Sequence, residues 1–237
     1  MKTMTNYLYF PANEWFETRN KPNILELIEH NSGLVCSKKG PWIAGGIVLS
    51  AITGAYSKDI DVFFSSNDQW QLNVEQLEKK LGLFPHPQYS DIVEGYLRYD
   101  KGWCTSAGLT TLSKAIQFIG FHTHANIEHL LNQFDISVAQ CGFDGTNIIV
   151  NSESMFGILN KIAVVRADYK NPHYGPRLGK LCYRIDKYRG KGFTFDKAQV
   201  REVKDLAELW FSEYGSSPLS YPKEVYMDFN DKPTEEK

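Results

Sequence analysis

The chain has 237 residues, of which 42% are hydrophobic and 23% charged, and a formal net charge of −2. This composition is typical of a folded soluble protein, and no apolar run approaches the ~18 residues that a membrane-spanning helix needs. The N-terminal segment lacks a signal-peptide pattern, so we expect a cytoplasmic protein without a membrane partner. The four cysteines show no C-x-x-C spacing, which argues against structural zinc and against a disulfide framework.

The predicted elements alternate between short helices and strands. Helices are expected over residues 23–31, 46–54, 73–83 and 126–134. Strands are expected over residues 41–44, 59–64, 114–121 and 134–150, and a hairpin over residues 95–112. The stretch 134–150 (FDISVAQCGFDGTNIIV) is typical of two strands joined by a tight turn at Asp144-Gly145. From Met155 to Tyr214 the pattern is helical.

This order predicts an α/β (α+β) fold: a palm-like mixed β-sheet with flanking helices, followed by a C-terminal α-helical lobe. The expected domain boundaries are 1–153 for the sheet domain and 154–228 for the helical lobe. Residues 229–237 are polar and are expected to form a disordered tail.

Three aspartates are the candidate metal ligands. Asp59 and Asp61 stand one residue apart on a predicted strand, so their side chains share one face while Ile60 and Val62 face the other. Asp135 lies on a later predicted strand. Carboxylate oxygens are ligands of hard divalent cations, and two ions ~3.5–4 Å apart are the arrangement used for in-line displacement at phosphorus. A cation would also relieve the repulsion between Asp59 and Asp61.

A glycine pair precedes the first two aspartates. Gly45 and Gly46 lie between a predicted strand and a predicted helix, where glycine permits close backbone approach and the helix N-terminus offers N–H groups to an anion. Ser50 and Thr53 follow on the helix, within reach of a phosphate or of packing and capping roles. The order of strand, Gly-Gly, helix, D-x-D strand and later strand aspartate is far more specific than any one part.

The run AGGIVLSAITGAYSKDIDVFF resembles the signature of the DNA polymerase β-type nucleotidyltransferase superfamily, and QFDISVAQC is similar to its third-carboxylate strand. The resemblance implies catalytic and metal-binding roles for Asp59, Asp61 and Asp135, two Mg²⁺ ions (or Mn²⁺), and a nucleoside triphosphate held at Gly45 and Gly46. In many members a serine follows the first glycine. Here that residue is Gly46, so one hydroxyl contact is missing.

A basic segment follows the sheet region. Residues 161–192 carry nine Lys or Arg and two Asp, a net +7, which leaves −9 for the rest of the chain. A helix beginning at Pro176 would place Arg177, Lys180, Arg184 and Lys187 on one stripe. This stripe is either a solvated helix face or a binding surface for triphosphate or nucleic acid. Tyr188 and Phe193 are candidates for stacking on a base.

The leading hypothesis is a metal-dependent nucleotidyltransferase that moves an NMP from an NTP to a hydroxyl acceptor and releases pyrophosphate. An RNA 3′ end, such as that of tRNA, is weakly favoured as acceptor over a protein side chain or a small molecule. The alternative is a catalytically inactive nucleotide- or RNA-binding module on the same fold. A metal-dependent phosphohydrolase is a third hypothesis.

Overall fold

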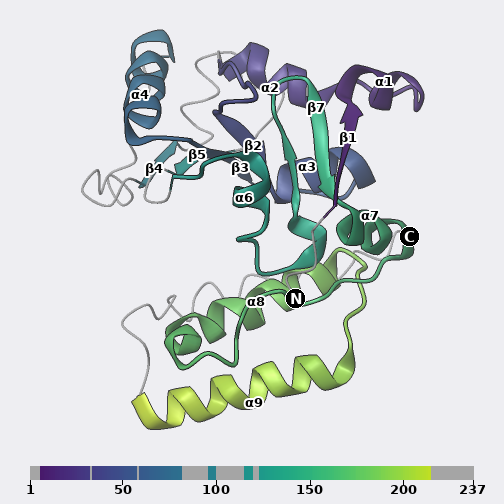
Figure 1. Ribbon diagram of the computed structural model, residues 1–237, viewed down its shortest axis with the longest axis vertical. Coiled ribbons are helices and arrows are strands. Elements are labelled where there is room, and N and C mark those ends of the chain that lie inside the picture. The colour runs from purple at the N-terminus through teal and green to yellow at the C-terminus, as the bar shows by residue number, and fades with distance from the viewer. Residues whose placement is uncertain are drawn as a thin grey trace, which may run out of the picture. The chain divides into compact units, whose positions relative to one another are not determined.

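The computed structural model describes residues 6–32, 34–57, 59–81, 96–99, 115–119 and 123–214 (Figure 1). They belong to two compact units. The first comprises residues up to Ala167 together with Tyr188–Thr194, and the second comprises Asp168–Lys187 and the residues from Phe195 onward. The first unit holds the sheet and the second is helical, which confirms the expected α/β (α+β) class.

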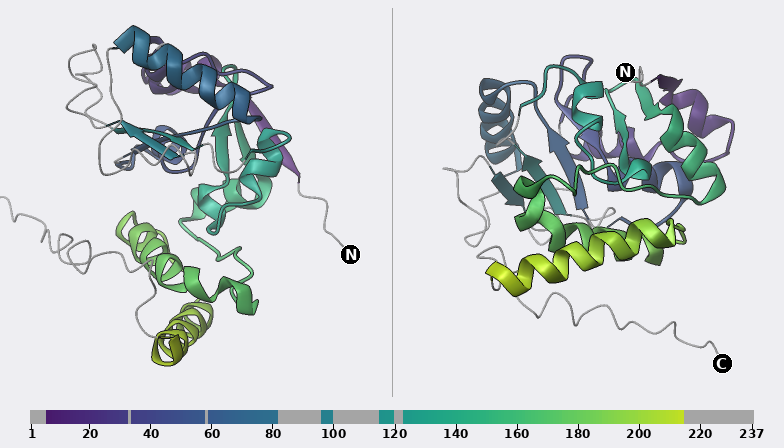
Figure 2. Two further views of the ribbon diagram at one scale, coloured as in Figure 1. Left: turned by 90° about the vertical axis from the view of Figure 1, so that its left-hand side faces the viewer. Right: turned by 60° about the horizontal axis from the view of Figure 1, so that its bottom comes forward.

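A mixed sheet of seven strands forms the first unit (Figures 1 and 2). The strand order is β1-β7-β6-β2-β3-β5-β4. The strands are β1 (Tyr7–Pro11), β2 (Trp42–Ala44), β3 (Asp59–Phe63), β4 (Tyr96–Tyr99), β5 (Ala115–Ile119), β6 (Cys141–Phe143) and β7 (Asn147–Asn151). Among the described strands, β3 and β5 run parallel, and every other neighbouring pair is antiparallel.

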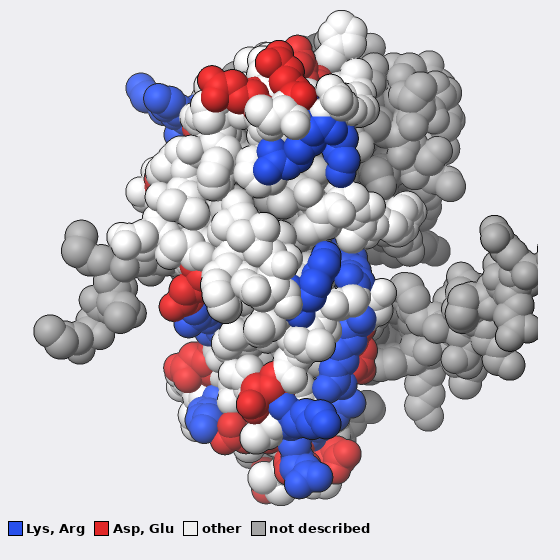
Figure 3. Space-filling model, turned by 90° about the vertical axis from the view of Figure 1, so that its right-hand side faces the viewer, with Lys and Arg blue, Asp and Glu red and all other residues white. Residues whose placement is uncertain are grey.

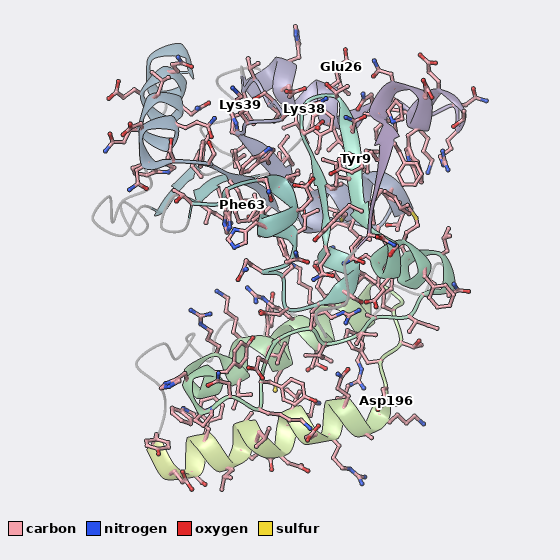
Figure 4. All side chains as sticks on the ribbon, viewed as in Figure 1. Tyr9, Glu26, Lys38, Lys39, Phe63 and Asp196 are labelled. Atoms are coloured by element: carbon pink, nitrogen blue, oxygen red, sulfur yellow. The ribbon has the colours of Figure 1, made fainter. Side chains whose placement is uncertain are left out.

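Helices cover the two faces of this sheet. They are α1 (Ala12–Glu17), α2 (Ile24–Ser32), α3 (Gly46–Thr53), α4 (Asn67–Leu81), α6 (Ile127–Leu131) and α7 (Ser152–Asn160). α3 packs against β2, β3 and β6, behind the sheet in the view of Figure 1, whereas α6 lies in front of it. Three buried side chains of α6 belong to one apolar cluster with Trp42 and Phe63. Phe63 is the last residue of β3 (Figure 4).

Two local predictions are confirmed in detail. Asn126 caps α6, because its side-chain oxygen accepts a hydrogen bond of 2.7 Å from the backbone N–H of His129. Asp144 forms the turn between β6 and β7: its Oδ1 accepts hydrogen bonds from the backbone N–H groups of Thr146 (3.0 Å) and Asn147 (2.6 Å). The next residue, Gly145, adopts a φ of +86°, which suits glycine at a tight turn.

The second unit contains α8 and α9. A 3-10 helix, η5 (Pro172–Arg177), leads into α8 (Leu178–Gly190), whose last three residues belong to the first unit, and α9 (Lys197–Tyr214) follows. The α-helix expected to begin at Pro176 therefore begins at Leu178, and the prediction was wrong by two residues. α9 packs closely against η5 and the start of α8. The Trp210 ring lies where a Cβ at Gly175 would be, and a Cβ at Gly179 would lie 2.9 Å from the Phe211 ring.

The expected boundary after residue 153 falls inside α7, which packs against β7 and against a 3-10 turn, η4 (Ser137–Ala139). Of the hairpin predicted over 95–112, only β4 lies among the described residues, and it pairs with β5. No helix in the described parts of the chain is long and apolar enough to cross a membrane.

Candidate functional site

The Gly45-Gly46 turn connects β2 to α3 as predicted. Gly45 has φ +77° and ψ −130°, a conformation that residues with a Cβ rarely adopt, and its N–H donates a 2.8 Å hydrogen bond to the carbonyl of Cys141. A Cβ at Gly45 would lie 2.9 Å from Cε1 of Phe134. Glycine is therefore required at this position both by the backbone conformation and by the close approach of the Phe134 ring.

The start of α3 has no side-chain cap. Gly45 occupies the N-cap position, and no side-chain hydrogen bond caps the helix there. The first N–H groups of an α-helix have no intrahelical acceptor and carry a partial positive charge. In this arrangement they are suited to an anion such as a phosphate group.

Asp59 and Asp61 lie beside this turn. Asp61 pairs across the sheet with Ala44, the residue that immediately precedes Gly45. Both aspartates are half-buried, whereas Ile60 and Val62 between and after them are fully buried on the other face. The prediction that the two carboxylates share one face of a strand agrees with this alternation.

α6 covers only part of that face. Its residues Ile127, Leu130 and Leu131 pack in one apolar cluster with Trp42 and Phe63. Trp42 pairs with Phe63, and Ala44, which pairs with Asp61, belongs to the same cluster, so the aspartates directly adjoin its edge along β3. The carboxylates therefore stand at the border between a dry core and the glycine turn.

A third polar side chain, Gln117, joins Asp59 and Asp61 on this face and was not predicted from the sequence. Gln117 on β5 is paired in parallel register with Asp61 and is half-buried, between the buried residues Ile116 and Phe118. Residues in register on neighbouring strands point to the same face. The signal was missed because the parallel pairing joins two segments more than fifty residues apart, which no local pattern can align.

Asp135 is not on a strand, so that prediction was wrong. It occupies a bend before Ile136, which forms an isolated bridge with Val165, and η4 follows directly. The carbonyl of Asp135 accepts hydrogen bonds from the backbone N–H groups of Arg166 (2.6 Å) and Ala167 (3.3 Å). The segment is held by these non-strand partners, and β6 begins only at Cys141.

Serine side chains explain why this segment leaves the strand conformation. The hydroxyl of Ser137 accepts a 2.9 Å hydrogen bond from the N–H of Val164, and the carbonyl of Ser137 accepts one of 2.6 Å from Ser154 Oγ. Such side-chain bonds compete with a strand ladder for the same backbone groups. A pattern of alternating apolar residues does not reveal them.

The three predicted metal ligands are not gathered as a set. Among the residues that the structure describes, no three Asp, Glu, His or Cys side chains form a group that could hold a metal ion. The donor chemistry of the Asp59–Asp61 pair, two carboxylates on one face, fits a Mg²⁺ ion that completes its shell with water and phosphate oxygens. The role of Asp135 as a third ligand stays a prediction.

The remaining predicted residues fall in both units. Ser50 is half-buried on α3, and its carbonyl accepts a 2.8 Å hydrogen bond from the N–H of Gly54. Arg177 ends η5, and Lys180, Arg184 and Lys187 follow on α8; Arg184 is half-buried and the other three are exposed. These four cations belong to the second unit, where Asp and Glu side chains are interspersed with Lys and Arg (Figure 3). Their part in nucleotide binding stays a prediction.

Two other candidates have structural roles. Tyr188 and Phe193 are both buried and lie edge to face with ring centroids 6.3 Å apart, so they pack on each other rather than present a surface for a base.

Cys141 is fully buried next to the glycine turn, and burial raises the pKa of its thiol to about 12. The thiol is therefore neutral at physiological pH and is not a nucleophile.

Solved structures of CCA-adding enzymes resemble this chain. The Thermotoga maritima CCA-adding enzyme in complex with tRNA shows a TM-score of 0.54 at 15% identity, over 87% of this chain and 47% of that one. A CCA-adding enzyme in complex with ATP shows a TM-score of 0.58 at 16% identity, over 87% and 48%, and one with CTP shows 0.56 at 15%, over 86% and 48%. At this identity the likeness shows a nucleotidyltransferase-like fold, and the chain spans about half the length of these enzymes.

Sequence comparison gives a closer relationship. None of the curated proteins compared with this chain matches it. The model of the Gad2 family, described as "Gabija anti-defense 2 family protein", matches residues 13–161, which is more than half of the chain and extends from α1 through the glycine turn, both strand aspartates and Asp135 to the end of α7. The chain therefore belongs to the Gad2, Gabija anti-defense 2, family.

Proposed function

We propose that this protein is a metal-dependent nucleotidyltransferase that transfers an NMP from an NTP to a hydroxyl acceptor and releases pyrophosphate. The observation that carries the proposal is the position of Asp61: it pairs with the residue before the Gly45-Gly46 turn, on a sheet of the nucleotidyltransferase-like fold. Two carboxylates and an uncapped helix start thus meet at one point of the sheet.

The residues of the chain divide the work as follows. The N–H groups at the start of α3 bind phosphate oxygens, and Gly45 allows the backbone to come close to them. Asp59 and Asp61 hold the ion, with Asp135 as the candidate third ligand, which also orients the acceptor and receives its proton. A bond forms between the acceptor oxygen and the α-phosphorus while the bond from that phosphorus to the pyrophosphate oxygen breaks. When bound, a divalent ion supplies positive charge that stabilises the charge developing on the transferred group.

RNA, a protein side chain and a small molecule are the candidate acceptors, and the first two have support from similar proteins. The CCA-adding enzymes supply one argument for RNA, since one of them was solved with tRNA, and the cations Arg177, Lys180, Arg184 and Lys187 are a second. The family description names a defence system as the target. A protein component of that system would offer side-chain hydroxyl groups as acceptors. We favour RNA, and the experiment below separates the two.

The test is incubation of the protein with each α-labelled NTP, Mg²⁺, and either purified RNA or a protein extract. We expect label in one acceptor class and release of an equal amount of pyrophosphate. Asp61→Asn should abolish transfer, because it removes one carboxylate charge while it preserves the shape of the side chain. Asp68→Asn is the matched control, since Asp68 is exposed in the first turn of α4. Equal labelling by wild type and Asp61→Asn would refute the catalytic assignment.

The alternative is an inactive nucleotide- or RNA-binding module. It is favoured by one observation, namely that the described residues do not gather three carboxylates. It predicts RNA binding that depends on salt, is indifferent to Mg²⁺ and is unchanged in Asp61→Asn. Release of phosphate in place of pyrophosphate would instead indicate a phosphohydrolase.

A further inference from the structure

Ser57 connects the start of β3 to the start of α3. It is buried, and its Oγ donates a 3.1 Å hydrogen bond to the carbonyl oxygen of Asp59. A Cβ built on Gly46, the first residue of α3, would lie 3.2 Å from the same Oγ. One hydroxyl therefore bonds to the strand that carries the aspartates and borders the space that a side chain at Gly46 would occupy at the helix start.

This contact explains the glycine at position 46. Gly46 has ordinary helical backbone and no need for glycine on conformational grounds, because its φ is not positive. What disfavours a side chain is space: 3.2 Å is tighter than most contacts of a Cβ, so the hydroxyl of the buried Ser57 would have to shift by a few tenths of an ångström. A serine at 46 and a serine at 57 would compete for the same place.

The hydroxyl also bears on the geometry of the metal site. The hydrogen bond from Ser57 fixes the backbone of Asp59 at the point where β3 begins, and hence the direction of its carboxylate. Site residues need to be held within about 0.5 Å of their productive positions, and supporting hydrogen bonds provide that precision. Loss of the bond removes this partner of the Asp59 carbonyl and the hydroxyl that borders Gly46.

We propose that Ser57 is a positioning residue of the nucleotide site, and that its hydroxyl takes the place of a side-chain hydroxyl at position 46. This inference rests on the proposed function, because it assigns Ser57 to the site formed by Gly46 and Asp59. The inference predicts that the site needs one side-chain hydroxyl between Gly46 and Asp59, and that either residue 46 or residue 57 can supply it.

The experiment is a hydroxyl exchange in the full chain. Ser57→Ala removes the hydroxyl, Gly46→Ser adds a second one that is crowded against Ser57, and the double variant moves the hydroxyl from 57 to 46. We expect each single change to lower kcat/KM for NTP by about tenfold and the double variant to recover to within about threefold of wild type. Binding of a non-hydrolysable NTP analogue with Mg²⁺, measured by equilibrium dialysis, should follow the same order.

A purely structural role for Ser57 makes the opposite prediction. The two losses would then multiply in the double variant, to about a hundredfold, or Ser57→Ala would lower the melting temperature while leaving kcat/KM unchanged; either result overturns the inference. A second pair covers the case in which the double variant does not fold. Ser57→Thr and Ser57→Val have the same shape and differ in the hydroxyl, so the Thr variant should exceed the Val variant about tenfold in kcat/KM, and equal values would contradict us.

Failure of this inference is distinguishable from failure of the proposed function. If Asp61→Asn abolishes transfer while the hydroxyl exchange shows no rescue, the site is catalytic and Ser57 does not position it. If Asp61→Asn leaves transfer intact, the proposed function fails whatever the exchange shows.

Discussion

Replacement of Gly45 by alanine tests the turn on which the candidate site depends. Two costs add at this position. The backbone conformation, φ +77° and ψ −130°, costs an L-residue about 1–3 kcal/mol. The new Cβ would lie 2.9 Å from Cε1 and 3.4 Å from Cζ of Phe134, and relief of such an overlap in a packed core costs about 1–3 kcal/mol more. We therefore expect Gly45→Ala to lower the free energy of unfolding by about 2–6 kcal/mol, with about 4 kcal/mol as the central value.

Gly54 provides the matched control. It has nearly the same φ, +79°, at the C-cap of the same helix, but nothing lies within 4 Å of a Cβ built there. Gly54→Ala pays the backbone cost alone, about 1–2 kcal/mol. The two positions share a positive φ but differ in ψ, −130° at Gly45 and −2° at Gly54, so the difference between the variants contains the contact with Phe134 together with the difference in backbone cost.

The measurement is urea unfolding of wild type and both variants, with linear extrapolation and a comparison of slopes. With a typical slope of about 2–3 kcal/mol per molar urea, Gly45→Ala should lower the midpoint by about 1–2 M and Gly54→Ala by less than about 1 M. Equal shifts in the two variants would refute the steric argument, because they would show that Phe134 moves aside at no cost. A shift below about 0.3 M in Gly45→Ala would refute the backbone argument as well.

Three further predictions concern the sheet unit. Asp144→Ala should lower the free energy of unfolding by about 1–3 kcal/mol, because the backbone N–H groups of Thr146 and Asn147, at a partly exposed turn, lose their acceptor. Asp144→Asn keeps an oxygen there and should cost about half as much in the same urea unfolding experiment. Burial raises the pKa of Tyr7 and of Tyr9 to about 12, so the folded state keeps both side chains neutral near pH 10, where the unfolded chain ionises them. Stability should be full below pH 10 and fall between pH 10 and 12, with a shallower fall in Tyr7→Phe. A melting temperature that does not change with pH over that range would contradict this prediction. Gln117→Glu should tighten Mn²⁺ binding about tenfold in titrations without nucleotide, because it adds a carboxylate in register with Asp61. The control variant Gln71→Glu changes an exposed residue and should leave Mn²⁺ binding unchanged. Equal Mn²⁺ affinities in the two variants would place Gln117 outside the site.

Sequence patterns were sufficient for the glycine turn and its neighbours because each signal there is local. A buried strand followed by glycine, an apolar helix ending at Gly54 and a strand with alternating aspartates are specified by residues within one stretch of the chain. The same is true of Asn126 and Asp144, whose side chains bond to backbone groups two or three residues away. In such segments local preference and the final fold agree.

Elements that depend on distant partners were missed. β1 was not predicted, and it exists through pairing with β7, which lies about 140 residues further along the chain. Asp135 was assigned to a strand because its neighbours alternate in hydrophobicity, but hydrogen bonds from Val164, Arg166 and Ser154 hold that segment as a bend and a 3-10 turn. Periodicity reports which side chains are buried, and it does not report which backbone groups have found partners elsewhere.

The half-burial of Asp59 and Asp61 changes the physical argument about their charges. Fully buried, two like charges on one face would require a permanent cation, since burial of unpaired charge costs several kcal/mol. At half-burial the effective dielectric constant is high, and their mutual repulsion costs only about 1–3 kcal/mol, which the fold can sustain without an ion. The balance changes when a triphosphate arrives at the start of α3, because its negative charge adds to theirs. We therefore expect the ion to enter together with the nucleotide. The protein should bind Mn²⁺ more tightly in the presence of an NTP analogue than alone, and the gain should exceed what the binding of Mn²⁺ to the free analogue explains.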